Sequence, residues 1–373
     1  AGRAMARSVP GDAPALASQT GAAVALGAIQ GFAGDLLERR GSPLATDLAL
    51  YVGGEPVAPT SAALAAAYPH ATDHLAVFLH GLCETEHAWR GFGRRTERAQ
   101  REPFPDRLAR DLGATPLLVR CNSGRHISDN ARDLAALLNA ATQQWPVEPA
   151  RITLIGHSMG GLIARAAAWQ AREQRWTTLI DHVICLGTPH HGADLEQGVH
   201  LLDWALGHTP ETRAFSRALR LRSAGIKDLR FGSASEADWH GHDPDELLRR
   251  RAAEVPFLEH AEYCWIGASL TPGPAGYLLG DLLVRTPSAS GSGRGHRLPF
   301  TPDNGRTLTG LTHFDLLDHP AVYEQVHAWL TRPTKHRPDA EQYLRSRHHE
   351  GFPINALRGR PRPTARNLRR RPR

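Results

Sequence analysis

Short apolar runs that alternate with helical patterns constrain the fold of this chain more than any other feature. Five runs of strand length are apolar almost throughout, which predicts strands that are buried on both faces of a sheet. Strands that alternate with helices favour one mostly parallel sheet, with helices on both sides. The runs are 74–82 (HLAVFLHGL), 115–120 (TPLLVR), 151–156 (RITLIG), 182–187 (HVICLG) and 262–267 (EYCWIG).

The segments between these runs have the three- and four-residue spacing of amphipathic helices. Ser128 is the expected N-cap of one helix, in which Leu134, Leu138 and Ala141 form the apolar face. Pro320 is expected to open the last helix of the folded part. The first of these helices lies between two of the predicted strands, and the last follows all five.

More than 70 residues separate the fourth apolar run from the fifth, which is far longer than an ordinary crossover. The segment contains apolar residues, a basic run and an acidic stretch with a tryptophan. We therefore expect residues 1–331 to form one domain, with a cap or lid inserted at about 193–260.

The positive charge of the chain is concentrated at its C-terminal end. Residues 332–373 contain 13 Lys and Arg against three acids, whereas the whole chain has a formal net charge of +6. Residues 1–331 are therefore net negative, and we expect no specific nucleic-acid partner. The segment is rich in Pro and Arg and poor in apolar residues, which predicts a disordered basic tail. Contact between this tail and an anionic membrane surface stays open.

The four cysteines show neither a CxxC pair nor metal-ligand spacing. They lie in or beside the predicted strands, which favours reduced thiols and a cytosolic setting. The chain has no run of about 18 apolar residues, so no membrane-spanning helix is expected. Residues 13–30 are mildly apolar and predict an ordinary first helix. The cysteines are Cys83, Cys121, Cys185 and Cys264.

The stretch Gly156-His157-Ser158-Met159-Gly160 contains the pattern GxSxG, which alone is a weak signal. Here it follows a predicted strand and opens a predicted helix (LIARAAAW), the setting of a nucleophile elbow. In such a turn the residues two before and two after the serine must be as small as glycine. The helix start also directs amide donors to the place where negative charge develops. The alternative is a glycine-rich turn with an incidental serine.

A serine hydroxyl needs a general base, and after a nucleophile elbow the chain order is Ser, acid, His. His313 is the candidate base, because it lies just before the last amphipathic helix. His319 is its rival but is more typical of a helix cap. Asp281 is the candidate acid that would orient the imidazole. Asp303, which looks like a turn residue, and Asp315, which is awkwardly close to the histidine, are the alternatives.

An oxyanion hole needs two fixed backbone amides. The candidates are Met159, directly after the serine, and Leu82, in the loop HGL that follows the first apolar run. Gly81 would let the backbone approach a substrate carbonyl, although a plain turn is the alternative. His190 and His191 lack matching acid or Cys spacing, so we expect packing residues and no metal site.

Several of these motifs together resemble those of bacterial lipase-like α/β hydrolases, close to the group that also resembles the GPI inositol deacylases. The similarity runs through roughly residues 20–331. RSAGIKDLRFG, at 222–232, is similar to the cap segment of bacterial members, whereas Cys83 and Leu282 stand where glycine is more usual. The motifs are LHGL at 79–82, GHSMGGLIAR at 156–165, LGTPHHGA at 186–193, GDLLV at 280–284 and HFDLL at 313–317.

The resemblance implies an α/β-hydrolase fold and hydrolysis of carboxylic esters through an acyl-enzyme. Ser158, Asp281 and His313 would form the catalytic triad, with Leu82 and Met159 as oxyanion donors and no cofactor. Acylglycerols or other lipidic esters are expected substrates, because the cap contributes apolar residues. A thioesterase or amidase with the same triad is the alternative among enzymes. A catalytically silent binding protein is the alternative outside them.

Overall fold

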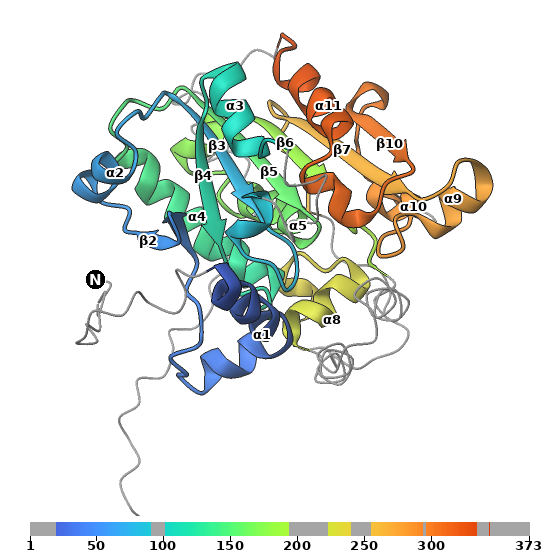
Figure 1. Cartoon of the computed structure of the whole chain (residues 1–373), viewed down its shortest axis with the longest axis horizontal. Coiled ribbons are helices and arrows are strands. Elements are labelled where there is room, and N and C mark those ends of the chain that lie inside the picture. The colour runs from blue at the N-terminus through green and yellow to red at the C-terminus, as the bar shows by residue number, and fades with distance from the viewer. Residues whose placement is uncertain are drawn as a thin grey trace, which may run out of the picture.

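An eight-stranded sheet forms the centre of the molecule, in the order β10-β7-β6-β5-β3-β4-β1-β2 (Figure 1). The structure is a computed structural model, and β3 to β7 and β10 run parallel in it. The strands are β1 (Ala49–Val52), β2 (Glu55–Val57), β3 (His74–Leu79), β4 (Thr115–Arg120), β5 (Arg151–His157), β6 (Ile180–Leu186), β7 (Glu262–Ser269) and β10 (Gly305–Thr309). The residues described are 20–90, 101–193, 223–239, 255–293, 296–333 and 343.

All five predicted strands are confirmed, and the sequence patterns missed three strands of this sheet: β10 at one edge, and β1 and β2 at the other end. Strands β1 and β2 form an antiparallel hairpin around Gly53 and Gly54, both of which have positive φ, at 62° and 88°. These strands are too short to show a pattern. Strand β10 is polar and mostly exposed, as an edge strand can be.

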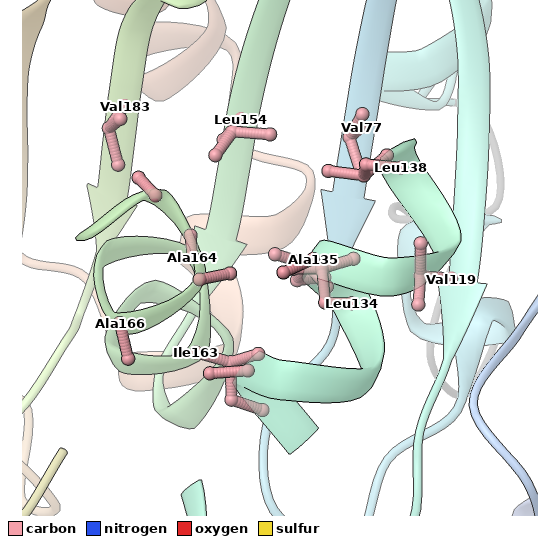
Figure 2. Close-up of a cluster of buried hydrophobic side chains, with 14 of the residues drawn as sticks. Val77, Val119, Leu134, Ala135, Leu138, Leu154, Ile163, Ala164, Ala166 and Val183 are labelled. Carbon is pink, nitrogen blue, oxygen red and sulfur yellow. The ribbon is translucent and has the colours of Figure 1, made fainter. Parts of the chain in front are cut away.

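Alternate residues of the parallel strands face opposite sides of the sheet. On one side, Val77 of β3 and Leu154 of β5 belong to a core that α4 (Ile127–Gln143) and α5 (Met159–Gln170) cover. Figure 2 shows that Leu134 of α4 lies against this face. Because both faces of each strand are covered, the strands are apolar throughout rather than alternating.

The other side of the sheet is covered by α3 (Phe104–Leu112) and α11 (Pro320–Leu330). Phe78 of β3 faces this side and packs in one core with Phe104 and Trp329, each almost fully buried. This confirms the predicted last helix and gives the sheet a helical layer on each face. The C-terminal ends of the parallel strands are left for loops, which is where such folds carry their sites.

The start of α4 differs from the prediction. The helix begins at Ile127, so Ser128 is inside the first turn rather than at the N-cap. Its hydroxyl accepts a hydrogen bond from Trp239 Nε1 at 3.0 Å. The cap comes from elsewhere in the sequence: Asp228 Oδ2 accepts from the Ile127 amide at 2.9 Å. A cap supplied by a distant segment leaves no local pattern, which is why it was missed.

Part of the predicted cap segment is described, and it is attached to the body. Helix α8 (Ala224–Phe231) lies beside α1 (Thr20–Arg39), as Figure 1 shows. The Ser223 hydroxyl, directly before α8, donates to the Gly31 carbonyl of α1 at 2.6 Å. Of the segment predicted at 193–260, the structure describes residues 193, 223–239 and 255–260, and the other residues lie outside the described part.

Little of the predicted basic tail is described. Of residues 332–373, only 332, 333 and Tyr343 belong to the described part. Tyr343 is buried, and its ring contacts His260 edge-on with centroids 5.0 Å apart. At this one position the chain packs on the body, which a fully solvated tail would not do. The prediction for the other tail residues lies outside the described part.

The cysteines lie where the sequence placed them. All four are free thiols, and Cys121, Cys185 and Cys264 are buried. Cys83 is half-buried, in the loop after β3. None of the helices in the described part of the chain has the length and apolar character needed to cross a bilayer.

Candidate active site

Ser158 occupies the sharp turn between β5 and α5. Its φ of 51° and ψ of −120° lie in a region that side chains other than glycine rarely adopt. The turn is held because the Ser158 amide donates to the Leu186 carbonyl at the end of β6, at 2.8 Å. The serine therefore lies at the C-terminal edge of the sheet, in the geometry expected of a nucleophile elbow.

The two glycines of the motif are required by the close approach of strand and helix. A Cβ at Gly156 would lie 2.3 Å from the Gly161 amide nitrogen in α5. A Cβ at Gly160 would lie 2.4 Å from the Leu79 carbonyl oxygen at the end of β3. Both distances are far below van der Waals contact with backbone atoms that cannot move independently. This confirms that only glycine-sized residues fit at these positions.

Asp281 and His313 are joined by a buried hydrogen bond, with 2.7 Å between His313 Nδ1 and Asp281 Oδ2. The second carboxylate oxygen, Oδ1, accepts from the amides of Leu283 and Val284, at 3.0 and 2.7 Å. Leu282, which lies between Asp281 and Leu283, has a φ of 78°. The acid is thus fixed by its own tight turn, and it fixes one nitrogen of the imidazole.

The surroundings of His313 change its pKa. Burial alone would lower the pKa, but the nearby negative charges of Asp281 and, more weakly, Glu84 favour the imidazolium. The result is a pKa above its ordinary value of 6.5. A histidine in this setting is stabilised when it takes up a proton, which a general base must do.

Ser158 and His313 are brought to the same turn at the end of β6. The Ser158 amide binds the Leu186 carbonyl, and a Cβ at the next residue, Gly187, would lie 2.9 Å from Cε1 of His313. Among the described residues, the Ser158 hydroxyl makes no hydrogen bond to His313 or to any other group. Such bonds are often long in proteins without substrate and tighten when the substrate binds.

The loop after β3 lies directly against Ser158. A Cβ at Gly81 would be 3.0 Å from Ser158 Cβ, so the backbone approaches as closely as a side chain would allow. Within the described part of the chain, the amides of Leu82 and Met159 have no hydrogen-bond acceptor. Cys83 has a φ of 62°, which explains why glycine is more usual there.

The rival residues have other roles. His319 is the N-cap of α11, where its Nδ1 accepts from the Ala321 amide at 3.2 Å, as predicted. Asp303 lies in the turn Pro302–Asn304. Asp315 forms a capping box with Thr312, whose amide donates to Asp315 Oδ2 at 2.7 Å. The structure therefore brings Asp281, and neither alternative acid, to the His313 ring.

Two further ionisable side chains lie beside the serine, and the sequence patterns did not point to them. Glu84 and His157 are both almost fully buried, with 3.0 Å between Glu84 Oε2 and His157 Nδ1. His157 is the variable residue of the GxSxG pattern. Glu84 directly follows the segment HGLC. The only hint in the sequence that Glu84 is buried is that a charged residue follows so soon after an apolar strand.

His190 packs inside the molecule. Arg165 donates to its Nδ1 at 2.8 Å, and its ring contacts Phe300 with centroids 5.2 Å apart. Burial, followed by the positive charge of Arg165, lowers the pKa of His190 well below its usual value, so the ring is neutral. In the part of the chain that the structure describes, no group of three or more His, Cys, Asp or Glu side chains is arranged to hold a metal.

Residues 72–208 match the family model of the PGAP1-like alpha/beta domain. The matched segment contains the Gly81 loop and the Ser158 turn. Together with the parallel sheet and its helical layers, this match confirms the predicted resemblance to lipase-like α/β hydrolases.

Solved structures of esterases and lipases are similar to this chain at low identity. The mature lipase BlEst2 of Bacillus licheniformis is 18% identical with a TM-score of 0.45, covering 69% of this chain and 92% of its own. A lipase-esterase related protein of Clostridium acetobutylicum is 13% identical with a TM-score of 0.38, covering 69% and 95%. The carboxylesterase CesB of Bacillus subtilis is 12% identical with a TM-score of 0.38, covering 69% and 84%. No curated protein matches the chain.

Proposed function

We propose that this protein is a serine hydrolase that cleaves carboxylic esters through an acyl-enzyme. Ser158 is the nucleophile, His313 the general base and Asp281 the residue that orients the base. The proposal is carried by the buried hydrogen bond of 2.7 Å between Asp281 and His313, together with the turn at the end of β6 that both His313 and the strained Ser158 contact. The proposal rests on this geometry rather than on the fold, because proteins of one fold catalyse many different reactions.

The chemistry follows from the tautomer of the base. Because Nδ1–H of His313 donates to the Asp281 carboxylate, Nε2 is left to accept the proton of the Ser158 hydroxyl. The serine oxygen then attacks the ester carbonyl and forms a tetrahedral intermediate. His313 returns the proton to the leaving alcohol, which leaves an acyl group on Ser158. Water, deprotonated by the same histidine, releases the acid.

The developing oxyanion would be stabilised by the amides of Leu82 and Met159. Met159 follows Ser158 directly and opens helix α5, and Leu82 follows Gly81, whose backbone closely approaches Ser158. One such donor typically lowers the barrier by about 3 to 4 kcal/mol. Support for lipidic substrates comes from the apolar residues of the segment at 193–260 in the sequence.

The proposal is tested by labelling the purified protein with a fluorophosphonate and assaying p-nitrophenyl esters of increasing acyl length. Wild type should take up the label and cleave the esters, and Ser158→Ala should do neither. A matching thioester and anilide show whether the leaving group is restricted to alcohols. A wild-type protein that takes no label and cleaves none of the three would overturn the assignment of Ser158.

A further inference from the structure

A buried carboxylate lies beneath the oxyanion loop. Glu84 Oε2 accepts a hydrogen bond from the Gly81 amide at 2.6 Å and lies 3.0 Å from His157 Nδ1. A bond of 2.6 Å from an amide is short, as is usual when the acceptor is charged. Burial would raise the pKa of Glu84, but the charge and hydrogen bond of His157 outweigh burial and the pKa is lowered. Glu84 is therefore a carboxylate.

His157 has acceptors at both of its ring nitrogens. Nδ1 faces the Glu84 carboxylate, and Nε2 lies 3.2 Å from the backbone carbonyl of His313. A carbonyl oxygen only accepts, so Nε2 is the donor in its contact with His313. Both ring nitrogens of the fully buried His157 are therefore held by hydrogen bonds, one to Glu84 and one to the His313 backbone.

The pair connects three segments that are far apart in the sequence. Glu84 holds the oxyanion loop through the Gly81 amide, His157 belongs to the elbow itself, and the His157 ring holds the backbone of His313. The rings of His157 and His313 are 4.7 Å apart between centroids. At Gly81 a Cβ would contact Ser158, Glu84 and His157 at once, at 3.0 to 3.2 Å.

We propose, on the basis of the proposed function, that Glu84 and His157 are a positioning pair that holds the oxyanion loop, the nucleophile and the base in one arrangement. Neither side chain touches the reacting atoms. A misplacement of about 1 Å in such sites costs about 100-fold in rate. The pair would therefore act on kcat rather than on substrate binding.

Glu84 also contributes charge to the site. The titratable groups that face His313 are Asp281 on its Nδ1 side, together with Glu84 and His157 behind the loop. His80 also lies next to the loop, where its Nε2 accepts from the Cys121 amide at 3.0 Å and its Nδ1 lies 2.9 Å from the Gly81 carbonyl oxygen. Removing the Glu84 charge should lower the pKa of His313.

The test compares Glu84→Gln, Glu84→Ala and His157→Gln with wild type. Glutamine can still accept from the Gly81 amide, so Glu84→Gln should lose about 10-fold in kcat and move the acidic limb of the pH profile to lower pH. Glu84→Ala and His157→Gln should lose about 100-fold in kcat with KM within about threefold. Fluorophosphonate labelling should slow in parallel.

Glu86→Gln is the matched control, because Glu86 is a buried carboxylate two residues away that binds Arg120 at 2.5 to 2.6 Å instead. It should lose stability while keeping the wild-type pH profile. The proposal fails if wild type is labelled and the Glu84 variants react at wild-type rates with an unmoved acidic limb. If wild type takes up no label, the proposed function is wrong, and the role of the pair is not what has failed.

A second measurement does not depend on a variant folding. Proton NMR of the histidine rings in wild type should show a His157 ring proton that exchanges slowly with solvent, because the buried ring is bonded to Glu84 and to the His313 carbonyl. A His157 ring proton that exchanges as fast as that of a solvent-exposed histidine would overturn the proposal.

Discussion

At the scale of single residues, the candidate site is built on strained backbone. Three residues other than glycine have positive φ among the described part of the chain: Cys83, Ser158 and Leu282. Cys83 lies in the loop after β3, Ser158 in the turn between β5 and α5, and Leu282 in the turn that holds Asp281. Such conformations cost of order 1 to 3 kcal/mol each and are kept where the surrounding structure fixes them.

The backbone strain at Ser158 predicts that glycine is more stabilising than alanine at this position, which is the reverse of the usual order. In ordinary positions glycine is less stabilising than alanine by roughly 0.5 to 1 kcal/mol. At a φ of 51°, Ser158→Gly should instead be more stable than Ser158→Ala, by about 1 kcal/mol, with both inactive. Urea unfolding of the two variants measures the difference. If alanine proved the more stable, the elbow would not be strained.

The raised pKa of His313 predicts where activity is lost on acidification. The base must be neutral to act, and its pKa lies above the ordinary 6.5, so kcat/KM should fall to half at a pH above 6.5. Asp281→Asn should move this limb to lower pH and reduce kcat by about 10⁴-fold. A pH–rate profile on a p-nitrophenyl ester tests both. An acidic limb well below pH 6 in wild type would contradict this prediction.

At the scale of elements, one buried carboxylate joins α8 to α4. Asp228 of α8 accepts from the Ile127 amide at 2.9 Å and lies 3.1 Å from His126 Nδ1. The His126 ring in turn stacks on Trp239, with centroids 3.9 Å apart. The described part of the predicted cap segment is therefore attached to the start of α4. It also approaches Met159, because a Cβ at Gly225 of α8 would lie 3.2 Å from Cε of Met159.

Loss of this carboxylate should weaken the whole fold. Asp228→Ala removes a helix cap and leaves buried donors unpaired, so we expect a loss of about 2 kcal/mol in the free energy of unfolding. Asp129→Ala, in the same helix turn, removes only a partly exposed ion pair with Arg132 and should cost less than about 1 kcal/mol. Equal losses in urea unfolding would show that Asp228 is not the cap.

At the scale of the whole molecule, a second buried polar network lies at the N-terminal ends of β5 and β6, at the end of the sheet opposite to Ser158. Asp181, whose side chain is fully buried, accepts from the Thr153 hydroxyl at 3.0 Å and pairs with Arg151 and His182. Burial opposes its ionisation, but these partners outweigh burial and lower the pKa from 3.8 to about 2. The ionised aspartate is therefore part of what joins β5 to β6.

This lowered pKa predicts how stability depends on pH. The contribution of Asp181 is fully present above pH 3.8 and is lost as pH falls through about 2, and its size is about 2 kcal/mol. The stability difference between wild type and Asp181→Asn should therefore be constant from pH 7 to pH 5 and shrink below pH 4. A difference that does not change with pH in urea unfolding would show that ionisation is not the cause.

Much of the fold could be predicted because its central strands are buried on both faces, so that each strand is a continuous run of apolar residues in the sequence. The edge strands, such as β10, were missed because half-exposed strands need no apolar pattern. The places of Ser158, Asp281 and His313 followed from chain order and motif. Glu84 and the Asp228 cap were missed because their partners are distant in the sequence. Glu84 pairs with His157, and Asp228 caps the helix that begins at Ile127, so neither contact produces a local sequence pattern.

The central claim, that Ser158 carries the acyl group, is tested most directly by mass spectrometry of protein quenched in acid during turnover of a p-nitrophenyl ester. We predict a mass increase equal to one acyl group, located on the peptide that contains Ser158 and enriched in Asp281→Asn if deacylation slows more than acylation. The adduct should be absent in Ser158→Ala. Ester hydrolysis that proceeds unchanged in Ser158→Ala, with no acyl adduct in wild type, would contradict the account.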